Sequence, residues 1–307
     1  MNEEHQSNTL NFLSVLGVFW KRKLFISYFV FSAAIISVIV SLLLPSIYRS
    51  SAILSPSDSE SSMSNSLGGS IGGLASVVGI NLPSAGTVSV EAFKSLTTLS
   101  FFENSVLPYI NLEDIMAVDY WDASKNSIVY DKKKFDSQKG VWVRKAKNLA
   151  LSKPSSQEAY KKFRKSISIS EDPKTKLVTV SVEHKSPYVA NLWASIMVNE
   201  INKKFRSDHK KEASIAIDYL NSLISQTNYS EVKKAIAQLI QSETQKMIVI
   251  ESNPEYVYTI IDPPAIPELR AKPRRAFICI AGTLIGFIIG GFVTLYRDRD
   301  KIFSSSK

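Results

Sequence analysis

Two long apolar runs without a charged side chain, one near each end, constrain this sequence more than any other feature. The first covers residues 24–44 and the second covers residues 276–296. A run of 21 residues rises about 31 Å as a helix, which matches a hydrocarbon core of roughly 30 Å. We therefore expect two transmembrane helices. Apolar residues concentrated in this way exclude an ordinary cytosolic enzyme.

The first run is typical of an anchor that stays in the chain. It is longer than the about 7 to 15 apolar residues of a signal peptide, and it ends at Pro45 without a small-x-small cleavage site. Three basic residues precede it and only Arg49 follows closely, so the positive-inside bias places the N-terminus in the cytoplasm. Two crossings then put residues 1–23 and 297–307 on that side, and residues 45–275 on the other.

The charge and the reactive residues narrow the chemistry further. The 37 Lys and Arg against 28 Asp and Glu give a net charge of +9, which favours solubility or an anionic neighbour such as phospholipid. A single cysteine, Cys279, excludes an internal disulfide and a multi-thiolate zinc site. His184 and His209 are far apart in sequence, and Glu113 with Asp114 lies in a predicted loop, so all four are expected in solvent. We expect no catalytic, cofactor or metal site.

Periodicity predicts the elements of the segment between the runs. Strand patterns cover residues 48–54, 167–170, 177–183 and 256–261, and helical patterns cover residues 88–107, 156–164, 187–226 and 231–247. Residues 55–73 are Ser/Gly-rich and favour a loop, residues 74–82 fit a docking segment, a re-entrant hairpin or a strand, and the polar residues 119–140 favour a solvated loop.

The longest pattern begins at Pro187 behind Ser186, which is suited to an N-cap, and it continues to Gln226. Such a helix is about 60 Å long, which is too long to be buried inside one small domain. The strands at both ends of the segment are tied to the membrane spans, whereas the helices lie between them. We therefore predict an α+β fold with a membrane-proximal α/β base and a long helical arm.

Four sequence patches follow one another in a distinctive order. They are Pro45-x-x-Tyr48-x-x-x-Ala52-x-Leu54-x-Pro56, the apolar residues 73–82, Ser186-Pro187-x-x-Ala190-x-x-Trp193, and Asp262-Pro263-Pro264-Ala265-x-Pro267 leading to Lys272-Pro273. In this order, and between two anchors, the chain resembles the polysaccharide co-polymerases. This chain length determinant family sets the length of lipopolysaccharide O-antigen in Gram-negative bacteria.

The resemblance implies a ring-shaped homo-oligomer in the inner membrane, with the domain of residues 45–275 in the periplasm. It further implies action with the O-antigen polymerase on a lipid-linked polysaccharide, without catalysis, without a cofactor and without nucleic acid as a partner. The helical pair predicted here is short for the family's longer arms.

Small residues recur on one face of each apolar run. They are Ala33, Ser37 and Ser41 in the first run and Gly282, Gly286 and Gly290 in the second. Because no hydrophobic force draws helices together in lipid, close packing across small residues is one of the few sources of attraction. We hypothesise that the six residues are transmembrane packing sites, within or between protomers. The alternative is that glycine is simply common in membrane helices.

A proline-rich segment leads into the second run and contains Pro263, Pro264, Pro267 and Pro273. Proline opposes both helix and sheet pairing, so we expect a stiff spacer that holds the base at a set height over the bilayer. The alternative is a plain linker.

Two other functional classes remain open. One is an adaptor for capsule or exopolysaccharide export, built on the same plan. The other is a two-span periplasmic sensor, which the short tail of residues 297–307 argues against because signalling needs a cytoplasmic output.

Overall fold

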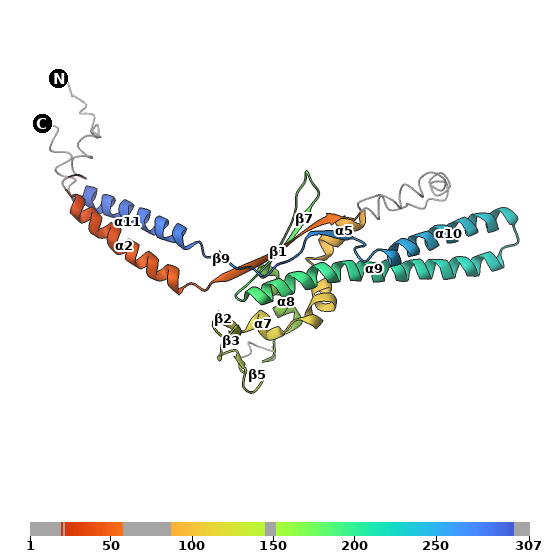
Figure 1. The fold of residues 1–307 in the computed structure, drawn as a ribbon, viewed down its shortest axis with the longest axis horizontal. Coiled ribbons are helices and arrows are strands. Elements are labelled where there is room, and N and C mark those ends of the chain that lie inside the picture. Colours follow the sequence, from red (N-terminus) through yellow and green to blue (C-terminus); the bar gives the residue numbers. More distant parts are fainter. Residues whose placement is uncertain (1–19, 21, 58–86, 145–151, 298–307) are drawn as a thin grey trace, which may run out of the picture. The chain divides into compact units, whose positions relative to one another are not determined.

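The computed structural model describes residues 20, 22–57, 87–144 and 152–297, whose fold is drawn in Figure 1. Most of the predicted loop of residues 55–73, and the whole undecided segment of residues 74–82, lie outside the described residues. Contacts divide the chain into two compact units, residues 1–46 with 270–307 and residues 47–269.

The first unit is built on two apolar helices, α2 (Lys23–Leu43) and α11 (Arg275–Arg297), which pack against each other. Each is long and apolar enough to cross a membrane. Both sets of bounds agree with the predicted spans to within one residue. A short strand, β9 (Arg270–Lys272), precedes α11.

The second unit contains an antiparallel sheet with the strand order β6-β7-β1-β8. Its strands are β1 (Ile47–Pro56), β6 (Ile167–Glu171), β7 (Val178–His184) and β8 (Tyr258–Asp262), which confirms the four predicted strands with small shifts at their ends. In the β1–β7 pair, Ala52 lies opposite Val180 and Leu54 lies opposite Val178, and all four side chains are buried. Since side chains alternate along a strand, this register places one apolar face of the sheet on the core.

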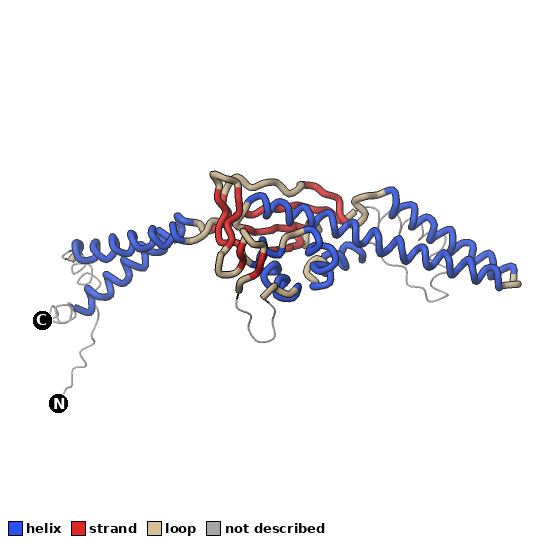
Figure 2. Tube along the Cα trace, turned by 90° about the horizontal axis from the view of Figure 1, so that it is seen from below, coloured by secondary structure: helices blue, strands red, loops and turns tan. Residues whose placement is uncertain are grey.

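The helix predicted over residues 187–226 is confirmed as α9 (Pro187–Gln226), with the same bounds. Its N-terminal part packs on β1 and β7, where the Ser186 hydroxyl accepts a hydrogen bond from the backbone N–H of Val189. Its C-terminal part pairs with α10 (Ser230–Ser252) to form the helical arm seen in Figures 1 and 2. The second helix thus continues five residues beyond its predicted end at Met247, and Ile250 in this extension is fully buried.

Two helices, α9 and α8 (Ser156–Ser166), pack against strands of the sheet, and helices lie beside the strands in Figure 2. The helix α8 confirms the one predicted over residues 156–164, and the π-helical turn η1 (Phe102–Val106) packs against both α9 and α8. Their aromatic rings stack in sequence, with ring centroids 4.9 Å apart for Phe102–Phe163 and 5.2 Å apart for Phe163–Trp193. This row of rings belongs to the hydrophobic core.

The continuous helix expected over residues 88–107 is wrong. The chain instead forms α5 (Thr87–Ser95), α6 (Leu99–Phe101), η1 and the 3-10 turn η2 (Leu107–Tyr109). Thr98 causes the break because its hydroxyl donates to the carbonyl of Ser95 at 2.8 Å and accepts from the N–H of Phe101 at 3.2 Å. A side chain that bonds to nearby backbone groups favours a cap over a helix interior.

The solvated loop expected over residues 119–140 is also wrong. After the short helix α7 (Leu112–Met116), this region forms two hairpins, β2 (Val118–Asp122) with β3 (Ser127–Tyr130), and β4 (Phe135–Asp136) with β5 (Val141–Trp142). Phe135 is buried against Tyr130 and Trp142, with ring centroids 5.7 Å and 5.1 Å away. Aromatic contacts spread over thirteen residues therefore hold together a region that reads as polar.

One buried amide joins α9 to β8. The Asn202 Oδ1 accepts hydrogen bonds from the N–H groups of Val257 at 3.0 Å and of Tyr258 at 2.9 Å, and its Nδ2 donates to the Tyr258 carbonyl at 2.9 Å. Asn202 is 5% exposed. The start of β8 is thus held to α9 by side-chain hydrogen bonds, in addition to its pairing with β1.

Replacing Asn202 with Leu should lower the free energy of unfolding by roughly 2–4 kcal/mol, because three buried hydrogen bonds to the backbone would be lost. The same substitution at Asn199, which is exposed on the same helix, should change it by less than about 0.5 kcal/mol. Urea unfolding of the detergent-solubilised protein, followed by circular dichroism, measures both. Equal destabilisation by the two variants would show that the hydrogen bonds from Asn202 to β8 add nothing to stability.

Candidate functional site

The two stripes of small residues predicted in the apolar runs face each other within one chain. A Cβ atom built on Gly282 would lie 2.4 Å from the Cβ of Ser37, and one built on Gly286 would lie 2.6 Å from the Cβ of Ala33. Such distances are far below van der Waals contact, so α2 and α11 approach as closely as they do only because these positions lack side chains.

The remaining stripe positions differ in their contacts. Gly290 approaches Phe29 and Ile26 of α2, not a small residue, and its added Cβ would lie 3.1 Å from the Phe29 Cβ. Ser41 is buried, and its hydroxyl has no hydrogen-bond partner among the described residues. The two helices therefore approach each other most closely at Gly282 and Gly286. That the small residues also form contacts between protomers stays a prediction.

The predicted proline segment begins where β8 ends. Residues 263–269 form neither helix nor strand, and the carbonyl of Ala265 accepts a hydrogen bond from the Ser50 hydroxyl at 2.8 Å. From its sequence we expect no sheet pairing anywhere in this proline-rich segment. This expectation is wrong at the C-terminal end of the segment, where the strand β9 forms just before Pro273. No proline lies inside β9, so its backbone donors are available for pairing. The role as a stiff spacer stays a prediction.

Sequence reasoning missed a polar cluster between α7 and the end of β7. His184 is only 8% exposed, so the expectation of a solvated histidine is wrong here. Its Nδ1 accepts from the N–H of Ser186 at 3.0 Å, which leaves Nε2 to donate to the backbone carbonyl of Asp114 at 3.0 Å. Burial lowers the pKa of His184, so the ring is neutral at pH 7.

The carboxylate of Asp114 is also buried, contrary to the surface position expected for it. It accepts hydrogen bonds from the Tyr130 hydroxyl at 2.7 Å and from Asn111 Nδ2 at 3.2 Å. Burial and this carboxylate raise the pKa of Tyr130. His209 is likewise half-buried, with Nδ1 3.0 Å from the Tyr256 hydroxyl, and burial lowers its pKa. No local pattern signals the burial of His184 and His209, because Asp114 and Tyr256 lie 70 and 47 positions away from them.

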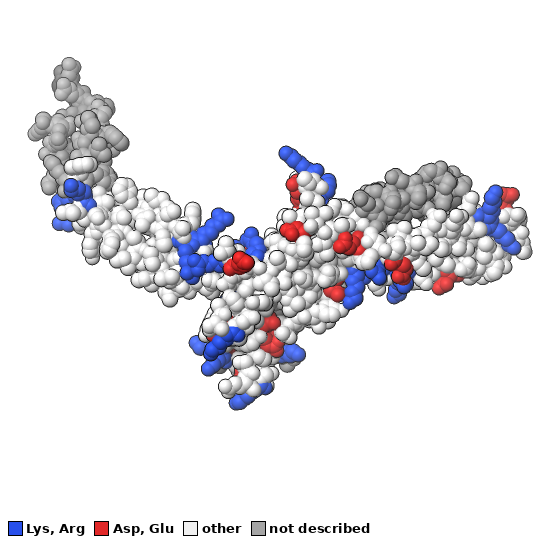
Figure 3. Space-filling view, in the orientation of Figure 1, with Lys and Arg blue, Asp and Glu red and all other residues white. Residues whose placement is uncertain are grey.

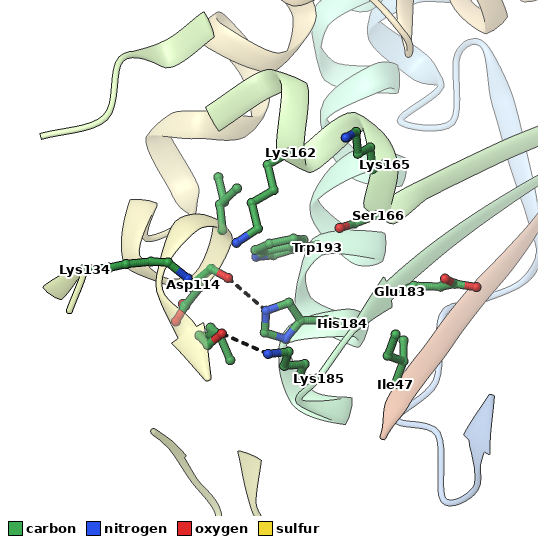
Figure 4. Close-up of a pocket in the computed structure, with 12 residues that line it drawn as sticks. Ile47, Asp114, Lys134, Lys162, Lys165, Ser166, Glu183, His184, Lys185 and Trp193 are labelled. Carbon is green, nitrogen blue, oxygen red and sulfur yellow. Dashed lines mark hydrogen bonds between the residues drawn. The ribbon is translucent and has the colours of Figure 1, made fainter. Parts of the chain in front are cut away.

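A pocket of about 300 Å³ opens over this cluster, and Figure 4 shows the side chains around it. Four lysines line it and define what we call the lysine pocket: Lys134, Lys162, Lys165 and Lys185. They come from the turn before β4, from α8 and from the residue after β7. Lys and Arg also gather over the lobe of β2 to β5 in Figure 3. The pocket thus collects positive charge from three separate elements.

Two of these ammonium groups are bound to backbone oxygens and not to carboxylates. Lys162 Nζ donates to the Met116 carbonyl at 3.1 Å, and Lys185 Nζ donates to the carbonyls of Val118, at 3.1 Å, and Asp119. Partial desolvation, with the nearby charges of Lys134 and Lys185, lowers the pKa of Lys162 to about 8. Burial also lowers the pKa of Lys185. The pocket is therefore an electropositive site with incompletely neutralised cations.

No group of three or more His, Cys, Asp or Glu side chains that could hold a metal ion occurs among the residues that the structure describes.

Comparison with known proteins matches one part of the chain to a family model. Residues 8–98 match the family model described as Wzz, chain length determinant protein. This match supports a Wzz-type family for the chain. No curated protein matches it. The matched residues include the first apolar run and β1, where the sequence resemblance begins.

Two solved structures are also similar. One is titled "full-length bacterial polysaccharide co-polymerase"; it is 12% identical, has a TM-score of 0.41, and the match covers 95% of this chain and 98% of that one. The other is a fragment of WzzB, a polysaccharide co-polymerase from Salmonella Typhimurium; it is 14% identical, has a TM-score of 0.33, and the match covers 74% of this chain and 100% of that one.

Replacing Gly286 with Leu should destabilise the α2–α11 pair by about 1–3 kcal/mol, because the larger side chain must force the helices apart. Ala276→Leu, at an exposed position of the same helix, should have an effect within about 0.5 kcal/mol. Titration with sodium dodecyl sulfate in mixed micelles measures the loss of helical structure. Equal midpoints for the two variants would contradict close packing at Gly286.

The lowered pKa of Lys162 predicts its reactivity. A neutral amine is the nucleophile, and a group with pKa about 8 is half neutral at pH 8, whereas an ordinary lysine is well under one per cent neutral there. Competitive acetylation followed by mass spectrometry should give Lys162 a labelling midpoint near pH 8, with labelling rising as the pH rises. A labelling midpoint at the pH typical of an ordinary lysine, above about pH 10, would refute the shift.

Proposed function

We propose that this chain is a non-enzymatic regulator of lipopolysaccharide O-antigen chain length in the inner membrane. The match of residues 8–98 to the chain length determinant family carries the proposal. Support comes from two helices of membrane-crossing length and from the helical arm of α9 and α10 between them. These features provide anchors and a scaffold.

In this proposal both termini are cytoplasmic and residues 45–275 are periplasmic. The basic residues just before α2 support this orientation, because positive charge is retained on the cytoplasmic side. Copies of the chain assemble into a ring that acts with the O-antigen polymerase on a lipid-linked polysaccharide. The geometry of the ring then biases how long the glycan grows before its release, without a chemical step by this protein.

The decisive experiment is deletion of the gene, followed by electrophoresis of extracted lipopolysaccharide. The parent should show a ladder with a preferred band, and the deletion should show a distribution without that preference. Reintroducing the wild-type gene on a plasmid should restore the band. An unchanged ladder in the deletion strain would refute a role in O-antigen length.

The same strains separate the export alternative. If lipopolysaccharide is unchanged while the size or amount of capsule or exopolysaccharide changes, the chain serves as an adaptor for that polymer. The family match supports a polysaccharide co-polymerase in either case.

A further inference from the structure

The lysine pocket holds more positive charge than its surroundings neutralise. Its lining includes four lysines against two carboxylates, Asp114 and Glu183. Glu183 is already bound to Arg49 at 2.5 Å, and Asp114 is satisfied by hydrogen bonds from neutral donors. Among the described residues Lys162 has no ion-pair partner. Lys134 is paired with Asp131, so the positive charge of the pocket is compensated only in part.

A second observation is a buried donor without an acceptor. Trp193 lines the same pocket and is 1% exposed, yet its Nε1 has no hydrogen-bond partner in the described part of the chain. Figure 4 shows the indole nitrogen on the side of the ring that faces the Lys162 ammonium. The rings of Phe163 and His184, with centroids 5.2 Å and 4.9 Å away, hold the indole in this orientation. A buried N–H normally has an acceptor, so this donor is suited to an oxygen atom of a ligand.

We propose that the lysine pocket binds the phosphate group of a phosphate ester. Each ammonium has three donors, and Lys162 uses one of them on the Met116 carbonyl, so two remain for a ligand. Lys134 is likewise engaged by a single carboxylate, that of Asp131 at 3.1 Å. The Trp193 N–H supplies a fixed neutral donor beside these mobile charges.

The arrangement favours phosphate over carboxylate. Donors that arrive from α8, from α9 and from the turn before β4 converge from different directions, which suits a tetrahedral anion. The cations among the described lining residues are lysines, whose ammonium groups act as point charges and commonly bind phosphate in proteins. The buried Asp114 carboxylate does not prevent binding, because Tyr130 and Asn111 already donate to it. A volume of about 300 Å³ is at the small end of ligand sites and accommodates a phosphate with a short esterified group.

Calorimetric titration of the full-length protein with glycerol 3-phosphate, in a neutral detergent at pH 7 and constant ionic strength, tests the site. We expect saturable binding that Lys162→Gln weakens by about 10- to 100-fold, the usual loss for a charge-assisted hydrogen bond. Lys161→Gln removes the same charge from the same helix but lies outside the lining, and it should change affinity less than about twofold, because salt screens a charge that does not contact the ligand. Absence of saturable binding, or equal effects of the two variants, would overturn the proposal.

Trp193→Phe retains the ring and removes only the N–H, so it should weaken binding by about 2- to 10-fold. Should this core variant fail to fold, the exposed Lys161 and Lys162 variants still decide the question. Unchanged affinity in a folded Trp193→Phe protein would remove the indole from the site and overturn its assigned role.

Two sources of the phosphate are separated by lipid composition. Ile47, which lines the pocket, follows the last residue of α2 by only four positions, so a lipid headgroup is one candidate. In nanodiscs of phosphatidylcholine, added phosphatidic acid should abolish the heat of glycerol 3-phosphate binding if the headgroup occupies the pocket. Retained binding, still lost in Lys162→Gln, would assign the site to a soluble phosphate ester.

Discussion

The pairing of β1 with β7 and β8 is the constraint on which the second unit depends. This strand follows α2 almost directly, yet its neighbours in the sheet come much later in the chain, as the Ser51–Ser181 hydroxyl contact at 2.9 Å across 130 residues shows. Closing such long loops costs chain entropy, and this cost is offset only when the hydrophobic core forms. Local elements, above all the β6–β7 hairpin and the α9–α10 pair, can form without that closure. The sheet is therefore complete only when β1 pairs with β7 and β8, because the elements that are local in sequence do not supply its central strand.

A single helix connects this sheet to the arm. The buried side chains of α9 are concentrated before Phe205, whereas beyond it Ala213 alone is fully buried. After Pro187 the helix contains neither glycine nor proline, which are the usual causes of a kink. The packing of the first turns on β1 and β7 therefore sets the direction of the arm without a built-in hinge. Asn202 adds to this rigidity, because it ties β8 to the same helix.

Sequence periodicity predicts those parts of the structure whose packing is repetitive. The bounds of α9, the alternation in β7 and the two apolar helices all come from long or strongly patterned segments. It fails where one side chain or a distant contact decides the structure. Thr98 breaks a helix through two hydrogen bonds, and the strands β4 and β5, each two residues long, depend on the burial of Phe135. Burial of His184 could not be predicted, since its partner Asp114 lies 70 positions away.

The same distant contact explains why charge can gather above it. His184 is neutral and uses both ring nitrogens on backbone groups, so it fastens the end of β7 to α7 without adding a cation. Asp114 is held by Tyr130 and Asn111 and is not drawn into an ion pair with a lysine. A fully satisfied polar network is rigid, and its members are not free to neutralise their neighbours. The lysines at the rim thus retain their charge because the groups beneath them are already paired, and an anion from outside the chain is the partner that this arrangement leaves room for.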